Sequence, residues 1–160
     1  METSSRADRL DAFDRRILRA LQADASLSTT ELAAQVGLSQ SPCWRRLQRL
    51  KDEGYIRGQV ALLDREKLGL NVQIFALVKL SAHGRANVDQ FAEAAQAYPE
   101  VIECHITLGA MDCMLRIVAA DMAAYKTFFF DKLSTLPGVQ EVNSVVSLSE
   151  IKSTTQLPVA

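Results

Sequence analysis

Arginine and amide side chains with the spacing of one helical face occur in the segment LSQSPCWRRLQRLKDEGYI, residues 38–56. Apolar residues at i, i+4 and i+7 predict the buried side of this helix; they are Cys43, Leu47 and Leu50. The opposite side is expected to present Gln40, Ser41, Trp44 and Arg45. Guanidinium and amide groups can form paired hydrogen bonds with base edges in the DNA major groove. The segment therefore predicts a DNA-reading helix.

Three other features of this helix allow two interpretations each. Arg46 and Arg49 either contact DNA phosphates or pair with an acid in their own domain. The Trp44 indole either contacts a thymine methyl group or packs against the preceding helix. The basic residues as a set could also be an ordinary solvated face, but the capping and turn signals around the helix favour contact with DNA.

The elements that must position this helix are two shorter helices before it. Asp11 opens the first, whose expected buried stripe is Phe13, Ile17, Leu18 and Leu21. The run Ser28–Glu31 is a capping box for a second helix, which stops at Gly37. Ser39 is expected to cap the third helix, Pro42 lies in its first turn, and Gly54 ends it. We expect a flexible tail over residues 1–10 and a (winged) helix-turn-helix DNA-binding domain over residues 11–57.

The periodicity changes after a hinge strand and linker, which we place at residues 58–70. Alternating apolar residues predict a strand from Val72 to Leu80. Both of its faces are apolar, so helices should cover one face and another surface, such as a partner subunit, the second. The next segments predict a helix, the strands Val101–Leu108 and Asp112–Ala119, a helix with Met122, Tyr125, Phe129 and Leu133 inward, and the strand Val139–Leu148. The fold class is therefore α+β, with a ferredoxin-like βαββαβ sandwich over residues 71–160.

The charge is uneven along the 160 residues, although the net charge is only −1. Residues 1–60 hold ten Lys and Arg against eight Asp and Glu, or +2, and residues 61–160 hold eight against eleven, or −3. This distribution of charge fits a basic DNA-binding domain followed by a neutral to acidic second domain. No apolar run is long enough to span a bilayer and the first residues are too polar for a secretory signal, so we expect no membrane partner and a cytoplasmic location.

Cysteine and histidine do not form a convincing site. Strand alternation is expected to put Ile102, Cys104, Ile106 and Leu108 on one face and His105 on the other, so Cys104 and His105 could not share one metal ion. We interpret Cys43, Cys104 and Cys113 as core residues. A redox pair of Cys104 and Cys113 would require that their strands place them directly opposite. With only two histidines, no nucleophile–base pair is evident, and we expect no enzyme, metal or cofactor.

Several separated motifs together resemble the leucine-responsive/AsnC (feast/famine) family of transcriptional regulators. They are LDAFDRRILRALQADA, the reading segment, ALLDREKLGL, LGAMDCMLRI and LPGVQEVNSVVSL. The resemblance implies a transcriptional regulator that binds double-stranded DNA, forms homodimers and assembles further, often to octamers. It also implies a small-molecule effector, usually an amino acid. Arg65 and the pair around Asp112, Met111 and Cys113, depart from the family's usual residues.

The family's effector pocket is built around a Gly-x-x-Asp turn, which matches Gly109 and Asp112 here. By local pattern alone these two residues are an ordinary hairpin turn. The resemblance instead implies a site where the carboxylate binds an α-amino group and backbone N–H groups bind an α-carboxylate. We expect Leu108 and Met111 beside them, and the hydroxyls of Thr154 and Thr155 in the same pocket.

Three other functions share part of this pattern. An architectural DNA-compacting protein would have the reading helix and no ligand. A ligand-binding or enzyme-regulating module would have the C-terminal sandwich, which is similar to ACT-type amino-acid-sensing domains, and would not bind DNA. An enzyme is the weakest of the three, because the sequence has no defensible catalytic group. A regulator whose oligomeric state and operator binding respond to an amino acid remains the preferred interpretation.

Overall fold

A computed structural model describes residues 10–81 and 85–159 of the chain. Contacts divide it into two compact units, one of which is the chain up to Ala61 together with the segment from Lys152 onward. The second unit is Leu62–Ile151. The expected tail, residues 1–10, lies outside the described residues except for Leu10, which packs against the core of the first unit.

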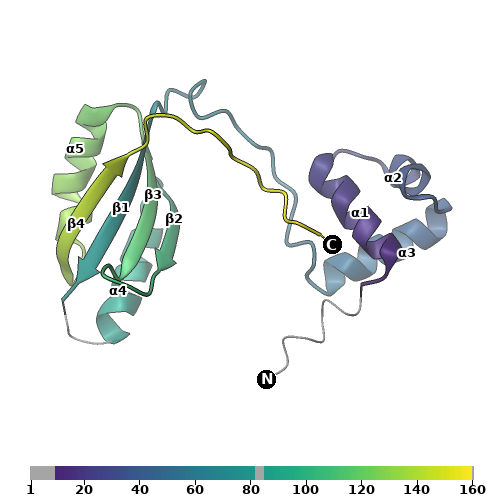
Figure 1. Ribbon diagram of the computed structural model, residues 1–160, viewed down its shortest axis with the longest axis horizontal. Coiled ribbons are helices and arrows are strands. Elements are labelled where there is room, and N and C mark those ends of the chain that lie inside the picture. Colours follow the sequence, from purple (N-terminus) through teal and green to yellow (C-terminus); the bar gives the residue numbers. More distant parts are fainter. Residues whose placement is uncertain (1–9, 82–84, 160) are drawn as a thin grey trace. The chain divides into compact units, whose positions relative to one another are not determined.

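The first unit contains three helices in the predicted order (Figure 1), and two of its predicted caps are confirmed. The Asp11 carboxylate accepts from the N–H groups of Phe13 and Asp14, and Asp14 accepts in return from Asp11 N–H. Ser28 and Glu31 cap each other in the same reciprocal way. Ser39 occupies the N-cap position of the third helix, but its side chain makes no capping hydrogen bond. The helices are α1 (Ala12–Ala23), α2 (Thr29–Val36) and α3 (Gln40–Asp52).

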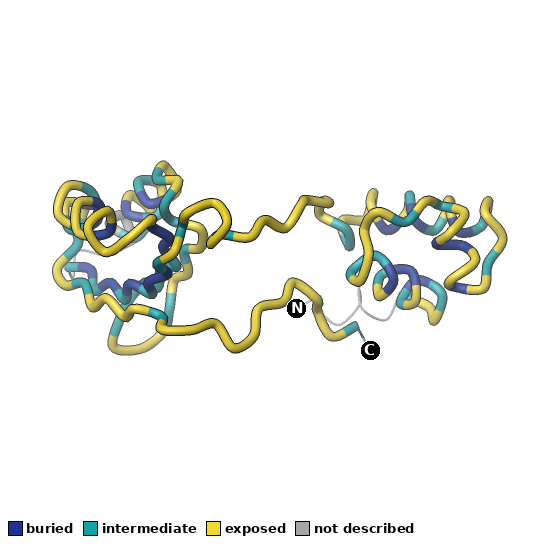
Figure 2. The backbone as a smooth tube through the Cα atoms, turned by 90° about the horizontal axis from the view of Figure 1, so that it is seen from above, coloured by how far each residue is buried: buried dark blue, intermediate teal, exposed yellow. Residues whose placement is uncertain are grey.

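The core of this unit lies between the three helices, which Figure 2 shows as dark blue inner faces. Cys43, Leu47 and Leu50 are buried as predicted, and Gly37 ends α2 in the left-handed conformation at φ 75°. The predicted stripe of α1 was partly wrong. Ile17 is fully buried and Leu18 and Leu21 pack half-buried against the same core as predicted, but Phe13 is not among the core residues. The other buried positions of α1 are Ala20 and the charged Asp14.

The second unit is the predicted βαββαβ fold, a four-stranded antiparallel sheet in the order β2-β3-β1-β4. Its helices follow β1 and β3, and a turn of 3-10 helix, Leu133–Thr135, follows the second helix. Residues 53–71 contain no helix or strand in the described structure, so the expected hinge strand is unpaired within this chain. The elements are β1 (Val72–Leu80), α4 (Arg85–Gln96), β2 (Val101–Ile106), β3 (Cys113–Ala119), α5 (Met122–Asp131) and β4 (Val139–Val146).

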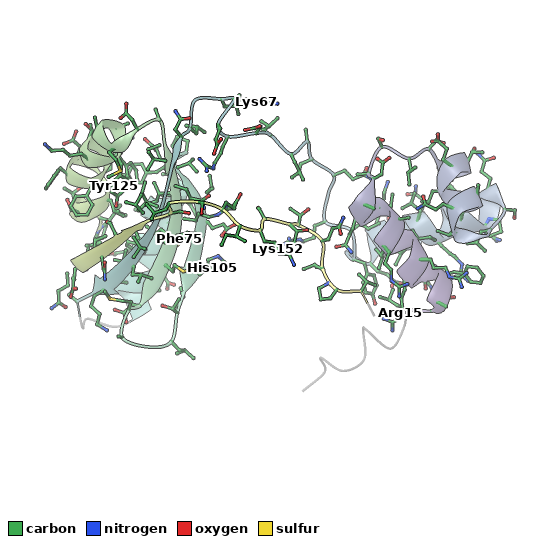
Figure 3. All side chains as sticks on the ribbon, turned by 45° about the horizontal axis from the view of Figure 1, so that its top comes forward. Arg15, Lys67, Phe75, His105, Tyr125 and Lys152 are labelled. Carbon is green, nitrogen blue, oxygen red and sulfur yellow. The ribbon has the colours of Figure 1, made fainter. Side chains whose placement is uncertain are left out.

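One face of the sheet carries the core, and on the other face Phe75 and Leu77 are only half-buried within the described residues. Ile74, Ala76 and Val78 are fully buried and pack with Phe91 of α4. The hydroxyl of Tyr125 lies 2.5 Å from that of Ser144 on the same face. Phe75, which is labelled in Figure 3, lies on the opposite face of β1. Its partners on the neighbouring strands are Arg116 and Val145.

Two predicted patterns in this unit were partly wrong. Tyr125 and Leu133 are buried and Phe129 packs against the core as predicted, but Met122 is 49% exposed and Phe128 is buried in its place. In β2 the register shifts between Val101 and Glu103, so Val101 and Cys104 both pack against the core. A β-bulge interrupts simple alternation and turns Ile102 outward. Ile106 pairs with the buried Cys113, on the predicted face with Cys104, and is exposed because it ends an edge strand. Leu108 lies beyond β2 and is exposed.

Within the described residues, none of the helices has the length and apolar character of a membrane span.

Candidate functional sites

The outward side of α3 is an exposed polar surface. The four residues predicted to point outward are all exposed, and they fall within an arc of about 140° at 100° per residue. Trp44 is 52% exposed, so it is not a core residue, but about half of its surface is covered by the rest of the chain. Arg45 has no carboxylate within ion-pair distance among the described residues. The four are Gln40, Ser41, Trp44 and Arg45.

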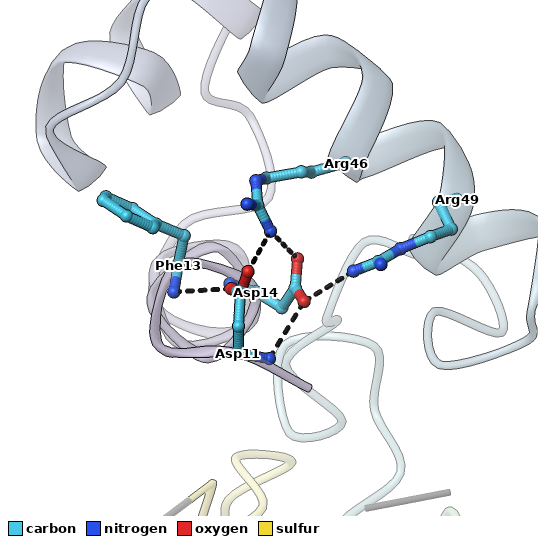
Figure 4. Close-up of polar contacts among 5 residues, drawn as sticks. All are labelled: Asp11, Phe13, Asp14, Arg46 and Arg49. Atoms are coloured by element: carbon cyan, nitrogen blue, oxygen red, sulfur yellow. Dashed lines mark hydrogen bonds and ion pairs between the residues drawn. The ribbon is translucent and has the colours of Figure 1, made fainter. Parts of the chain in front are cut away.

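Arg46 and Arg49 do not belong to this arc, because both turn toward α1 (Figure 4). One nitrogen of Arg46 lies 2.6 Å from Asp11 Oδ2 and 2.9 Å from Asp14 Oδ1. Arg49 Nη2 lies 2.5 Å from Asp14 Oδ2. Of the two interpretations of these arginines, the structure therefore supports pairing with an acid in their own domain.

Asp14 is the centre of this network, and its residue exposure is zero. Its two oxygens accept from two arginines of α3 and from the backbone N–H of Asp11. A buried carboxylate is tolerated when its charge is paired and its oxygens are hydrogen-bonded. The network thus fixes α1 to α3 and sets the orientation of the exposed arc.

The charges in this network reinforce each other. The backbone N–H of Asp14 and the Arg46 guanidinium lower the pKa of Asp11. Hydrogen bonds to Asp11 and then to Asp14 raise the pKa of Arg46. Both groups are therefore held in their charged forms, and the positive charge of Arg46 is largely compensated before any DNA approaches.

The pattern of the sequence did not lead us to predict the role of Asp14. A signal was present in the spacing. Leu10, Asp14, Ile17 and Leu21 follow one another at intervals of three or four residues, so Asp14 lies on the same helical stripe as three apolar residues. A charge on a buried stripe requires a partner of opposite sign. The two inward-turned arginines of α3 are those partners.

The second candidate site is the turn between β2 and β3, which brings together four of the residues expected at an effector site. Leu108 and Gly109 are exposed, and Met111 and Asp112 are half-buried. Gly109 has φ 149°, where an L side chain is strained although the space around it is open. The turn is closed by Thr107, whose hydroxyl donates to the Met111 carbonyl at 2.8 Å.

Asp112 is already engaged with β1. Its Oδ2 accepts from Leu80 N–H at 2.8 Å, and its Oδ1 lies 3.3 Å from Lys79 Nζ. The ladder between β1 and β3 ends at the pair Val78 and Cys113, so Asp112 satisfies the Leu80 N–H just beyond the end of that ladder. The Leu80 N–H, and then Lys79, lower the pKa of Asp112. The side chain is a fixed carboxylate, with about a third of it exposed to receive a cation.

Thr154 and Thr155 are not part of this turn. They belong to the segment that packs with the first unit, where the Thr154 hydroxyl accepts from the N–H of Gln156 at 3.1 Å. The division of the chain at residues 71–160 assigned this segment to the effector domain, whereas the contacts group it with the three helices.

The thiols behave as core groups. Cys104 pairs with Leu115 and Cys113 with Ile106, so the condition for a redox pair, directly opposed cysteines, is not met. Burial raises the pKa of Cys113 to about 11, with Cys104 and Asp112 adding to the shift. No cluster of three metal-ligating side chains occurs in residues 10–81 and 85–159.

In a comparison with known proteins, each of the two units matches a known domain family. The Lrp/AsnC ligand binding domain family matches residues 73–157, and the winged helix-turn-helix DNA-binding family matches residues 10–57. The chain is 39% identical over 150 residues to the DNA-binding transcriptional activator DecR of Escherichia coli, covering 94% of this chain and 99% of that one. It is 40% identical over 154 residues to a proline dehydrogenase transcriptional activator of Rhizobium radiobacter, covering 96% and 99%.

A solved structure is similar over nearly the same length. A transcriptional regulator from Neisseria meningitidis, crystallised as a complex with L-methionine, has 39% sequence identity and a TM-score of 0.89. The match covers 93% of this chain and 96% of that one.

Proposed function

Because the chain belongs to the Lrp/AsnC family of DNA-binding transcriptional regulators, we propose that the outward arc of α3 reads DNA and that an amino acid bound at the β2–β3 turn controls this binding. The observation that carries the first part is the division of arginines on α3. Arg46 and Arg49 are held inward by Asp14, while Arg45 is exposed on the same side as Gln40. A rigid base with a polar outer face is what insertion into the major groove requires.

This division assigns specific roles on α3. Gln40, Ser41, Trp44 and Arg45 contact bases, and the half-exposed Trp44 indole offers an apolar edge to a thymine methyl group. Arg46 and Arg49 act by holding the helix, and contribute less counterion release than free surface arginines would. Phosphate contacts then fall to other exposed cations, of which Lys51 in the last turn of α3 is one.

We propose that the regulator works as a homodimer that assembles further, as an octamer. The face of the sheet opposite the helices carries Phe75, Leu77 and Met114, all half-buried in a single chain. The linker also exposes apolar residues, with Val60 82% and Leu62 74% exposed. A second copy would bury these surfaces. Two paired reading helices predict a roughly palindromic operator, with half-sites about one helical turn or a multiple apart.

The effector site is proposed at Leu108, Gly109, Met111 and Asp112. The Asp112 carboxylate suits an α-amino group, and exposed backbone N–H groups of the turn suit an α-carboxylate. Leu108 and Gly109 are open to solvent, so a closed pocket needs a second surface, which a neighbouring dimer supplies. The related Neisseria regulator binds methionine, which favours an amino acid here. The assignment of Thr154 and Thr155 to the same site stays a prediction.

The effector would act on assembly and not by direct contact with DNA. A ligand shifts an equilibrium between assemblies only by its difference in affinity for them. Binding at the surface between dimers therefore changes the arrangement of the reading helices. We assign the chain no enzymatic activity, no metal and no cofactor besides this effector, and we infer that it acts in the cytoplasm because its DNA target lies there.

The experiment that tests the effector is a thermal-shift screen of the full chain against the twenty amino acids. A ligand that binds only the folded state raises the melting temperature with its concentration. We expect a rise for at least one amino acid, and no rise for the Asp112→Ala variant. The matched control is Asp131→Ala, an exposed carboxylate at the end of α5 that has no ion pair among the described residues. A flat screen from a chain that binds DNA would favour the architectural function.

DNA binding is tested separately by selecting duplexes from a random-sequence library with the full chain. A regulator should enrich a two-fold symmetric sequence. A chain that binds amino acids and enriches no DNA would instead be a ligand-binding module, and an architectural protein would bind all duplexes nearly alike.

A further inference from the structure

The segment Lys152–Val159 follows the last strand of the second unit, yet it packs with the three-helix unit. It has no helix or strand of its own, and in Figure 1 it is the yellow end of the chain, beside α1. We name these residues the C-terminal strap. The DNA-binding unit is thus joined to the second unit by two stretches of chain, the linker and the strap.

The strap is held by hydrogen bonds from the last turns of α1. The side-chain amide of Gln22 binds Leu157 at both backbone groups: Oε1 accepts from the N–H at 2.6 Å and Nε2 donates to the carbonyl at 3.1 Å. Arg19 Nε donates to the Val159 carbonyl at 3.0 Å. In return Gln156 Nε2 donates to the Gln22 carbonyl at 3.3 Å.

The geometry of the two segments explains the fit. Arg19 and Gln22 are three residues apart and therefore lie on one face of α1. Leu157 and Val159 are two residues apart and present their carbonyls to the same side of an extended chain. The Gln22 carbonyl belongs to the last turn of α1, where helix carbonyls lack a partner within the helix. The side chain of Leu157 is 73% exposed, so the backbone is what α1 recognises.

Proline favours the bound form of the strap. Pro158 restricts Leu157 to extended conformations, so less conformational entropy is lost when the strap binds. Pro158 has no N–H to leave unpaired between the two residues that α1 contacts.

The position of the strap on α1 connects it to DNA reading. The N-terminal end of α1 holds α3 through Asp11 and Asp14, and its C-terminal end holds the strap through Arg19 and Gln22. The linker, in contrast, is exposed from Gly58 to Asp64 and has no strand pairing in the described chain (Figure 2).

We propose that the C-terminal strap is a second tether that restricts the freedom of the DNA-binding unit, and that its contact with Arg19 and Gln22 makes two reading helices bind one operator together. Once one reading helix has bound its half-site, a second reading helix whose freedom is restricted has a higher effective concentration at the other half-site. Release of the strap should therefore weaken binding to a two-half-site duplex and spare binding to one half-site. This inference rests on DNA binding by α3 and on the two-half-site operator proposed above.

The contact itself is tested by hydrogen exchange at the Leu157 amide in the full chain, which requires neither DNA nor effector. We expect exchange slower than in an unstructured peptide of the same sequence, and about tenfold faster in Gln22→Ala than in the unaltered chain. Exchange of the unaltered chain at the peptide rate would overturn the docking of the strap.

The tether is tested with two variants and a matched control, using a duplex from the random-library selection and the same duplex with one half-site scrambled. Gln22→Ala removes the amide on α1, and Leu157→Pro removes the N–H on the strap. Ser153→Pro places the same substitution where the described chain shows no hydrogen bond. We expect the ratio of two-site to one-site affinity to fall about five- to tenfold in the first two variants and less than twofold in Ser153→Pro.

Two results would overturn the tether. One is a ratio unchanged within twofold in Gln22→Ala although the Leu157 amide exchanges faster. The other is an equal loss of one-site and two-site affinity, which would place Gln22 in the reading surface itself. Failure of the DNA-binding proposal looks different, because the unaltered chain would then select no duplex.

Discussion

Replacing Asp14 with asparagine keeps the shape of the side chain and removes the charge that joins α1 to α3. Removing one member of a buried ion pair commonly costs about 3–5 kcal/mol, because the other charge stays buried without a partner. Here the side chains of Arg46 and Arg49 are 29% and 43% exposed. Asp11 also remains beside Arg46. Partial hydration reduces the cost, so we expect Asp14→Asn to destabilise the first unit by about 2–3 kcal/mol.

Trp44 is the only tryptophan of the chain and lies in α3, so its fluorescence reports on the DNA-binding unit. Urea unfolding followed at Trp44 should show a midpoint lower by about 2 M for a unit of this size. Asp11→Asn is the matched control: Asp11 is 49% exposed, and asparagine caps a helix as well as aspartate does. We expect the control to cost less than about 1 kcal/mol. Equal losses in the two variants would refute the reasoning that burial makes Asp14 the anchor of α3.

Three further outcomes follow from the same geometry. Arg45→Ala should lower the preference for a selected duplex over a scrambled one by about 1–3 kcal/mol, measured by competition binding, and an unchanged preference would remove Arg45 from the reading surface. Gly109→Ala should lower the stability of the second unit by about 1 kcal/mol because of its φ of 149°, and a melting temperature equal to that of the unaltered chain would contradict this. The folded state lowers the pKa of Asp11, so its stabilisation should be complete above its unfolded value near about 4 and lost as the pH falls through the folded value. Urea midpoints of the first unit between pH 7 and pH 3 should therefore decline less in Asp11→Asn, and equal declines would argue against it.

Local patterns were sufficient for the three helices of the first unit, for the order of elements in the second unit and for the family, but not for the expected hinge strand. The capping boxes at Asp11 and Ser28 depend on residues three apart, and the buried residues of α3 follow one helical period. Such signals act within a few residues, so they can be recognised along the chain. The same holds for the order of strands and helices in the second unit, where the predicted β1 was confirmed from Val72 to Leu80.

The predictions of buried residues were wrong where contact with a distant segment determines which residues face the core. The bulge in β2 changes which residues face the core, and only pairing with β3 reveals it. The inward side of α5 depends on which residues meet the sheet, and Phe128 lies there in place of Met122. Periodicity predicts that a helix or strand has an apolar face. The surface that packs against this face determines which residues at its borders are buried.

The sequence by itself determined the helix α3 with its outward polar side and the Gly-x-x-Asp turn, because each is a short run of residues whose pattern is local. Only the tertiary structure decided how Arg46 and Arg49 are used, since their partner Asp14 lies more than thirty residues away in the chain. It alone placed the C-terminal strap on α1, 135 residues from Gln22 to Leu157. Long-range hydrogen bonds and ion pairs leave no periodic trace in a sequence, because the folded chain, not residue spacing, brings their atoms together.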